Sequence, residues 1–433
     1  MVHVPQSMTL GKGFYKVEGN YTLHFAAKKD YGWLAARCGL LTGTVVDDGR
    51  LALTVGNAEI PTVDGSDREA YALTVSENGV AIAANFEEGL SQGLRMLISL
   101  VNDYNGQVPC MTIQDEPKIS FRGLHCCIFR PNDGTDKEDS SPEALNTLLE
   151  NACLAGYNHV FLEFWGTFPY RKHPYACWPD SPYTRESVEA LIAHIIDDLH
   201  MTPLPCQNLT SHAGWSRISS RQHVVLDQRP DLADMWIPGG WCFATENPKT
   251  KQFLFDLIDD LCETFRNPPL FHVSSDKCFG FGSTEEDRTK PADALFTTHL
   301  CNLNTYLQSK GTRMVMWSDM LYSSMDALYW KPAEGIADTL PKNILINIWT
   351  HNDVGSHWAD IDYFESRGFQ TIYSPFLNKD GTNSMIKLCA KKGSLGILQT
   401  SWHRPQTALP TILYSGAAQW SGRSVSDQEL SRK

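Results

Sequence analysis

From Phe121 onward the chain repeats one pattern eight times: a short apolar run is followed by a longer segment with helical spacing. This alternation is typical of parallel strands connected by helices, because a crossover between parallel strands needs a dozen or more residues. The strand candidates are Gly123–Phe129, His159–Trp165, Met201–Gln207, Leu270–Ser275, Arg313–Trp317, Ile344–Trp349, Gln370–Ser374 and Leu395–Thr400. Eight units over roughly 300 residues favour an α/β fold of the (β/α)8 TIM barrel type, which needs about 250 residues. A doubly wound sheet is the alternative.

A different pattern precedes the repeats. Residues 71–75 and 80–84 alternate on either side of Asn78-Gly79, which predicts a β-hairpin. Apolar residues between Leu90 and Val101 then recur at helical spacing, which predicts a helix that covers one face of the sheet. A small N-terminal α+β domain is therefore expected.

The segment Val108–Pro117 is bounded by prolines and is expected to be a connector. On this basis the N-terminal α+β domain covers residues 1–118, and the (β/α)8 catalytic-type domain covers residues 119–433.

Charge and hydropathy limit the partners. The chain has 37 Lys plus Arg against 50 Asp plus Glu and a net charge of −13, which argues against nucleic acid or an anionic membrane surface as the main partner. No apolar run is long enough to span a membrane, and Met1–Tyr15 lacks the apolar core of a secretion signal. We expect a cytoplasmic protein, with a trimmed secreted form as the open alternative and a homodimer as one option for its assembly.

Local motifs exclude several chemistries. Phosphate-binding loops, His-Glu-x-x-His and Gly-x-Ser-x-Gly are absent. The twelve cysteines are scattered without any Cys-x-x-Cys pair, so we expect small buried hydrophobic residues rather than ligands. The sequence predicts neither a cofactor nor a metal site.

In a TIM barrel the chemistry lies on the loops that leave the carboxyl ends of the strands. Those ends carry Arg130, Trp165, His212 with Trp215, Asp276-Lys277, Trp317 with Asp319, Trp349 with His351 and Asp353, Tyr373, and Trp402-His403-Arg404. Aromatic walls with a few polar groups suit a sugar, whose ring has apolar C–H faces and a hydroxyl rim. Alternatively, the tryptophans only plug the mouth of the barrel.

Carboxylates are the candidate catalytic groups, because glycoside hydrolysis generally uses two of them. The candidates are Asp276, Asp319 and Asp353, with Glu163 less favoured because it lies within a strand. A solvated loop charge or a helix cap is the alternative for each of them.

These residues resemble glycoside hydrolase family 20, the β-N-acetylhexosaminidases, over most of the chain. The resemblance is carried by Ile113–Pro117, Phe121–Leu124, Arg130, Gly156-Tyr157-Asn158, His212, Phe271–Asp276, Trp317–Met320 and Thr400-Ser401-Trp402. It implies substrate-assisted retaining hydrolysis of terminal N-acetyl-hexosamine glycans, in which the sugar's own acetamido oxygen attacks.

The resemblance also implies roles for individual residues. Asp276 would polarise the acetamido group, Tyr373 would hold its carbonyl oxygen, and Arg130 would bind the C3 and C4 hydroxyls. Trp317, Trp349 and Trp402 would enclose the acetamido group, and His212 matches the histidine after the family's third strand.

The sequence departs from the family at its central position. Lys277 stands where the family has the glutamate that acts as general acid, and Cys127 replaces a common acidic residue. An ammonium has an ordinary pKa near 10.4 and is a poor proton donor at neutral pH. Trp165-Gly166 replaces a Glu-Asp pair of a related bacterial branch, and Arg404 occupies a place where many members have a glutamate.

Three interpretations follow. In the first, the chain is a hydrolase in which another acid, such as Asp319 or Asp353, replaces the missing glutamate. In the second, it is a catalytically impaired relative that binds glycans. In the third, Lys277 and Arg404 form a cationic pair for an anionic substituent on an amino sugar.

Overall fold

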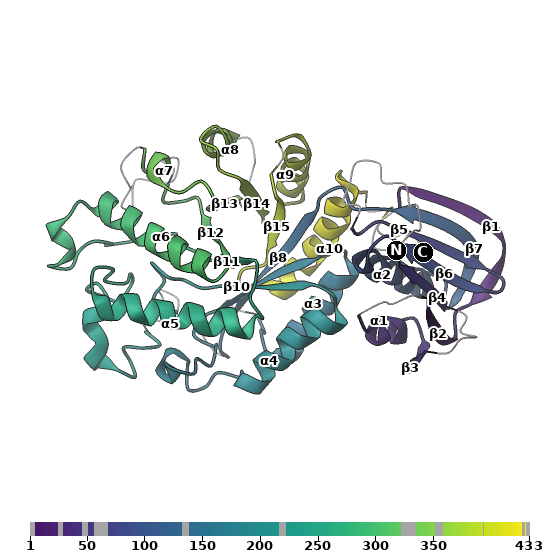
Figure 1. The fold of residues 1–433 in the computed structure, drawn as a ribbon, viewed down its shortest axis with the longest axis horizontal. Coiled ribbons are helices and arrows are strands. Elements are labelled where there is room, and N and C mark those ends of the chain that lie inside the picture. Colours follow the sequence, from purple (N-terminus) through teal and green to yellow (C-terminus); the bar gives the residue numbers. More distant parts are fainter. Residues whose placement is uncertain are drawn as a thin grey trace.

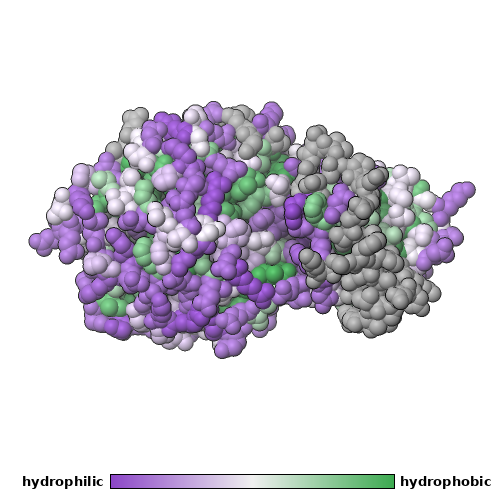
Figure 2. Space-filling model, viewed as in Figure 1, coloured by the Kyte–Doolittle hydropathy of each residue, from purple (hydrophilic) through white to green (hydrophobic). Residues whose placement is uncertain are grey.

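The computed structural model describes residues 5–24, 29–45, 51–55, 68–131, 138–215, 222–321, 335–350, 358–392, 394–426 and 429. It contains two parts, an N-terminal sheet domain and a closed barrel, which lie side by side in Figure 1. On the face shown in Figure 2 the surface of the barrel is mostly hydrophilic. Among the described residues, every helix is too short or too polar to cross a membrane.

The N-terminal domain is a seven-stranded sheet in the order β1-β7-β5-β6-β4-β2-β3. Its strands are β1 (Ser7–Lys16), β2 (Gly19–His24), β3 (Leu40–Val45), β4 (Leu51–Val55), β5 (Tyr71–Ser76), β6 (Gly79–Ala84) and β7 (Gln107–Asp115). The hairpin predicted around Asn78-Gly79 is the antiparallel pair β5 and β6. Helix α2 (Glu87–Asp103) buries an almost continuous apolar side, while the short helix α1 (Gly32–Arg37) lies beside it.

The predicted connector Val108–Pro117 is wrong. Most of it forms β7, which pairs with both β1 and β5 and so lies inside the sheet. Pro109 is tolerated because it lies opposite Phe14, next to the irregularity in the β1–β7 register. The proline therefore marks a bulge and not the end of the domain.

The second part is a closed barrel of eight parallel strands, as predicted, and the doubly wound sheet is excluded. Its strands are β8 (Phe121–Ile128), β9 (His159–Phe164), β10 (Thr202–Cys206), β11 (Leu270–His272), β12 (Arg313–Trp317), β13 (Leu345–Thr350), β14 (Thr371–Pro375) and β15 (Gly396–Thr400). The helices around it are α3 (Pro142–Leu154), α4 (Arg185–Ala193), α5 (Pro248–Thr264), α6 (Ala292–Ser309), α7 (Ile336–Thr339), α8 (Trp358–Glu365), α9 (Lys379–Lys392) and α10 (Pro405–Ser421). Figure 1 shows them surrounding the strands.

Local signals start several of these helices. Ser141 caps α3 by accepting a hydrogen bond from the Ala144 amide, and Pro142 occupies the first turn. Thr184 and Ser187 form a capping box at α4, and Asn247 caps α5. The loops that leave β8, β9 and β10 are thus fixed at their far ends.

The interior of the barrel has an apolar layer with a more polar layer above it. The apolar layer contains Phe121, Phe161, Leu204, Leu270, Val315, Leu345, Ile372 and Leu398. Because side chains alternate along a strand, the residues two positions further on face the same interior. In β9, β11, β13 and β14 these are Glu163, His272, Asn347 and Ser374, all buried. The chemistry-bearing layer therefore lies toward the carboxyl ends.

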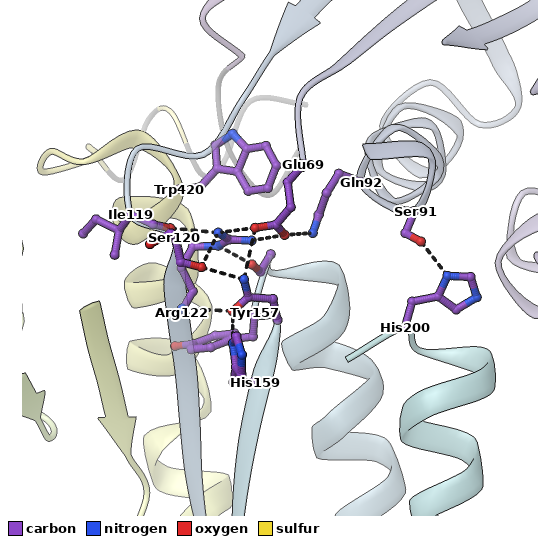
Figure 3. Close-up of polar contacts among 12 residues, drawn as sticks. Glu69, Ser91, Gln92, Ile119, Ser120, Arg122, Tyr157, His159, His200 and Trp420 are labelled. Atoms are coloured by element: carbon purple, nitrogen blue, oxygen red, sulfur yellow. Dashed lines mark hydrogen bonds and ion pairs between the residues drawn. The ribbon is translucent and has the colours of Figure 1, made fainter. Parts of the chain in front are cut away.

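A buried ion pair joins the two parts of the molecule (Figure 3). Arg122, on β8, is fully buried and contacts both carboxylate oxygens of Glu69, at 2.6 and 3.0 Å. Gln92 on α2 and Asn158 before β9 donate to the same carboxylate. Burial raises the pKa of Glu69, but Arg122 outweighs it, and the net shift is downward. Glu69 is therefore ionised at neutral pH.

The predicted division at residues 118 and 119 stays a prediction about where the domains end. The last strand of the sheet ends at Asp115, and the first strand of the barrel begins at Phe121.

Candidate functional site

Predicted residues from neighbouring strand ends meet at the carboxyl side of the barrel. Asp276 and Lys277 follow β11, Asp319 follows β12, and these three form what we call the Asp–Lys–Asp cluster. His212, from the loop after β10, and Trp349, in β13, contact the cluster. The barrel brings together residues that are up to 137 positions apart, counted from His212 to Trp349.

Asp276 is buried, with 9% of the residue exposed. Its Oδ2 lies 3.4 Å from His212 Nε2 and 3.8 Å from Lys277 Nζ. Burial acts to raise the pKa of Asp276, but His212 and then Lys277 outweigh it and hold this pKa well below its usual range. Asp276 is therefore an ionised carboxylate at any physiological pH.

Lys277 turns toward Asp319 rather than toward open solvent. Its ammonium pairs with Asp319 Oδ1 and lies 4.7 Å from the centre of the Trp349 ring. Trp349 Nε1 donates to the other oxygen, Asp319 Oδ2, at 2.6 Å. Both oxygens of Asp319 are therefore occupied within the protein.

Asp319 differs electrically from Asp276. Burial raises the pKa of Asp319, Lys277 opposes this effect, and the nearby charge of Asp276 adds to it, so the net shift is upward. Two carboxylates near one ammonium carry one more negative charge than positive. Asp319, whose side chain is the more buried of the two, has the higher proton affinity.

Aromatic rings form the surroundings of the cluster. The Trp317 and Trp402 rings lie 5.3 Å apart, and the His125 ring meets each of them edge-on. Trp317 is only 1% exposed, so it forms part of the floor, whereas Trp402 is half-buried. His212 packs between Trp165 and Trp241.

One contributor was missed at the level of sequence. Trp241 donates its Nε1 hydrogen to the Lys277 carbonyl at 2.6 Å and so fixes the loop that bears the cluster. It lies far along the loop after β10, and inspection of strand ends alone does not reach it. The Gly239-Gly240 pair directly before it, with both residues at positive φ, was the available signal of a tight turn.

The loop backbone around the cluster is strained. Among the described residues, His212, Ser274, Ser275, Lys277 and Trp402 all have φ between +47° and +65°, a region that non-glycine residues rarely adopt. Such conformations persist only where surrounding contacts enforce them, and they concentrate at functional sites.

Tyr373 does not belong to this group, which corrects its predicted role. It is fully buried, and its hydroxyl donates to Glu365, in α8, at 2.7 Å. Its neighbours Ile372 and Ser374 face the barrel interior, so the alternation of β14 turns Tyr373 outward toward the helices.

The two arginines lie at the edge of the site. Arg130 stacks 3.8 Å from the Trp178 ring centre and pairs with Asp180 at 3.3 Å and with Gln222, leaving 12% of its side chain exposed. Arg404 is exposed at the start of α10. Lys277 contacts Asp319 and Asp276, and its cationic pair with Arg404 stays a prediction. His351 and Asp353 lie outside the described residues.

Trp215, another of the strand-end tryptophans, is fully buried, and its Nε1 donates to the Asn208 carbonyl at 3.5 Å. Trp215 is therefore not available as an exposed wall for a sugar. The remaining predicted roles in sugar binding stay predictions.

Comparison with solved structures places the fold. The chain resembles the family 20 exo-β-N-acetylglucosaminidase from Vibrio harveyi, solved with N-acetylglucosamine, with a TM-score of 0.74 and 14% identity over 100% of this chain and 75% of that one. A β-N-acetylhexosaminidase from Bacteroides fragilis gives a TM-score of 0.71 and 16% identity over 98% of this chain and 90% of that one.

Sequence comparison assigns the family more specifically than comparison of structures does. A β-hexosaminidase from Akkermansia muciniphila is 36% identical over 73 residues, which cover 16% of this chain and only 14% of that protein. Two domain models match: "Glycosyl hydrolase family 20, domain 2" over residues 4–116, and "Glycosyl hydrolase family 20, catalytic domain" over residues 180–385. Together these matches span most of the chain, which therefore belongs to glycosyl hydrolase family 20 and is β-N-acetylhexosaminidase-like.

Proposed function

We propose that this chain binds a terminal N-acetyl-hexosamine at the carboxyl side of the barrel and hydrolyses only those glycosides whose leaving group needs no protonation. The observation that carries the proposal is the pairing of Lys277 with Asp319 beside an ionised Asp276. In this proposal Asp276 is the polarising carboxylate, and Lys277, a cation held by carboxylates, stands where the resemblance puts the acid.

Asp276 supplies the first half of the chemistry. As a carboxylate it accepts a hydrogen bond from the N–H of the sugar's acetamido group, which increases the electron density on the acetamido oxygen. That oxygen attacks C1 of the sugar, and the bond from C1 to the leaving oxygen breaks with its electron pair on the leaving group. A water oxygen then bonds to C1, the bond between C1 and the acetamido oxygen breaks and restores the acetamido group, and the proton lost by the water goes to solvent. His212 keeps Asp276 oriented and ionised for this role.

Departure of a poor leaving group requires a proton on the leaving oxygen. The described residues offer no good donor of this proton. The ammonium of Lys277 contacts Asp319 and lies 3.8 Å from Asp276, and both carboxylates favour its charged form. General acid catalysis contributes about 10²–10⁴-fold, so its loss affects poor leaving groups most.

Asp319 is the second candidate acid because its pKa is raised. Its two oxygens are engaged by Lys277 and by Trp349 Nε1, so delivery of a proton would first require both contacts to break. This arrangement favours the interpretation without a working acid.

A leaving-group series tests the proposal. Turnover of 4-nitrophenyl N-acetyl-β-glucosaminide is expected. The methyl glycoside should react at least about 10²-fold more slowly than it would with an enzyme that has a general acid. Asp276→Asn should abolish the aryl reaction. Equal rates for the two glycosides would show that a different acid operates and would contradict the proposal.

Restoring the acid is the complementary experiment. Lys277→Glu combined with Asp319→Asn avoids a third adjacent carboxylate and should accelerate cleavage of the methyl glycoside by about 10²–10⁴-fold. Lys387→Gln, an exposed change on α9, lowers the net charge by the same one unit as the double variant and should have no effect.

Sugar-binding measurements distinguish an impaired enzyme from a protein whose pocket does not recognise amino sugars. Calorimetry should detect N-acetylglucosamine but not glucose, because only the former carries the group that Asp276 recognises. Equal binding of the two sugars, or binding of neither, would contradict the proposed site.

A further inference from the structure

Directly beneath the Trp317 and Trp402 rings, three side chains with metal-ligating atoms converge inside the barrel. They are His125 and Cys127 on β8 and Glu163 on β9, all buried, and we call them the His–Cys–Glu cluster. Their ligating atoms all lie within 4.8 Å of one another. Glu163 Oε2 is 2.9 Å from His125 Nε2 and 3.2 Å from Cys127 Sγ.

The barrel itself places these groups at one level. Cys127 is paired in register with Glu163 on the neighbouring strand, and Glu163 is paired with Cys206 on β10. All three face the interior because they share the parity of inward positions on their strands. Cys206 is buried at 1% exposure and adds a second sulfur at the same level.

An outer contact orients the carboxylate. Asn208 donates from Nδ2 to Glu163 Oε1 at 2.7 Å, which leaves Oε2 directed at His125 and Cys127. The His125 ring is held edge-on against Trp317, at 5.9 Å, and Trp402, at 5.1 Å. Outer hydrogen bonds that fix a ligating carboxylate are a regular feature of protein metal sites.

From these contacts we propose that the His–Cys–Glu cluster binds one zinc ion through His125 Nε2, Cys127 Sγ and Glu163 Oε2. Mixed nitrogen, sulfur and oxygen ligation suits Zn²⁺, which takes four ligands in a tetrahedron. A water molecule completes the set.

The charges balance in this arrangement. On binding, the Cys127 thiol releases its proton to solvent as the sulfur–zinc bond forms, and Glu163 binds through a carboxylate oxygen. His125 binds as a neutral ring with its proton on Nδ1. One thiolate and one carboxylate then neutralise the two charges of the ion, which matters because a net charge is costly to bury.

The site differs in role from the Asp–Lys–Asp cluster. It lies under the Trp317–Trp402 pair and connects β8 to β9, so the ion would hold the floor of the sugar site in place. Metal content is measured without any sugar, and the inference therefore stands or falls separately from the proposed function.

The first experiment uses the full chain purified without chelator. Elemental analysis should find about one zinc per chain, and zinc added back to chelator-treated protein should release about one proton per ion and raise the Tm. Replacement by Co²⁺ should give the near-ultraviolet absorption of a thiolate–cobalt bond. Protein that binds neither Zn²⁺ nor Co²⁺ would overturn the proposal, because hydrogen bonds alone would then satisfy these residues.

Variants assign the ligands. Cys127→Ser should lose the cobalt–thiolate band, whereas Cys126→Ser, the adjacent buried cysteine on the opposite face of β8, should retain it. Asn208→Ala, which leaves every ligand intact, should weaken zinc binding by about 10–100-fold. An unchanged band in Cys127→Ser, or equal losses in both serine variants, would contradict the assignment.

Discussion

The proposed function depends most on Lys277, the residue at the position that the family resemblance gives to the general acid. Lys277 is built into the protein by an ion pair with Asp319 and a position over the Trp349 ring, and its carbonyl is held by Trp241. A lysine with such partners is part of the structure and not a solvated surface charge. The sequence identified the position, and the tertiary contacts show what holds the side chain there.

Tyr373→Phe tests on which side of the barrel wall the Tyr373 side chain of β14 lies. Loss of the hydroxyl should leave sugar affinity unchanged, because this group contacts Glu365 behind the barrel wall. It should lower the free energy of unfolding by about 1–3 kcal/mol, since Glu365 loses a buried hydrogen bond. Calorimetry and urea denaturation measure the two effects. A clear loss of sugar affinity at unchanged stability would restore the role that the resemblance implies.

At the level of secondary-structure elements, the closure of the barrel depends on close backbone approach between β15 and β8. A Cβ atom on Gly396 would lie 2.0 Å from the Phe121 carbonyl oxygen, and real Cβ atoms do not approach backbone so closely. Gly396 pairs with Phe121 in the register that joins the last strand to the first. This glycine is needed for contact and not for a turn.

Gly396→Ala should therefore destabilise the barrel strongly, by about 1–3 kcal/mol or more, because backbone must move to admit the methyl group. Thermal unfolding followed by circular dichroism measures the change. Gly32→Ala is the control, since the atom nearest to its added Cβ, at 3.1 Å, belongs to the flexible Asp30 side chain. Similar Tm values for the two variants would show that β15 is not held against β8 as described.

On the scale of the whole molecule, the two domains are joined through the fully buried Arg122. Glu69→Gln should cost about 3–5 kcal/mol, because it leaves the guanidinium buried without its counter-charge. Urea denaturation with probes in both domains gives the measurement, and Glu77→Gln, in the exposed turn between β5 and β6, is the control. Equal stability of the two variants would mean that the junction tolerates an unpaired Arg122.

Buried histidines give the whole chain a pH dependence. Burial is the main cause that lowers the pKa of His159, His200, His223 and His299 to about 4. Their unfolded pKa is near 6.5, so between pH 6.5 and pH 4 the unfolded chain binds more protons than the folded one. Stability should be full above pH 6.5 and fall toward pH 4, by up to about 1.4 kcal/mol per pH unit for each histidine.

Urea titrations at several pH values measure this slope. His200→Gln should make it shallower, because this variant lacks the His200 ring, whose pKa is lowered to about 4 mainly by burial. An unchanged slope in this variant would show that His200 has the same pKa in the folded and the unfolded chain.

The alternation of apolar runs and helical segments was enough to predict eight strands, their order and a closed barrel, because local periodicity records which residues must be buried. It also located Asp276, Lys277, Asp319, Trp349 and His212 at the strand ends, where the barrel fold requires chemistry to lie. Local patterns failed to predict which strands pair and which way a side chain points. The strand β7 was mistaken for a connector, and Tyr373 was assigned to the inner face of the barrel.

The tertiary structure alone decided which side chains meet. The pairing of Lys277 with Asp319, the support from Trp241, and the convergence of His125, Cys127 and Glu163 join residues from different strands and loops. Barrel register, strand pleat and the packing of loops set such contacts, and no spacing along the chain encodes them. For this reason the sequence could name the members of the site, while their charges and partners became evident only in three dimensions.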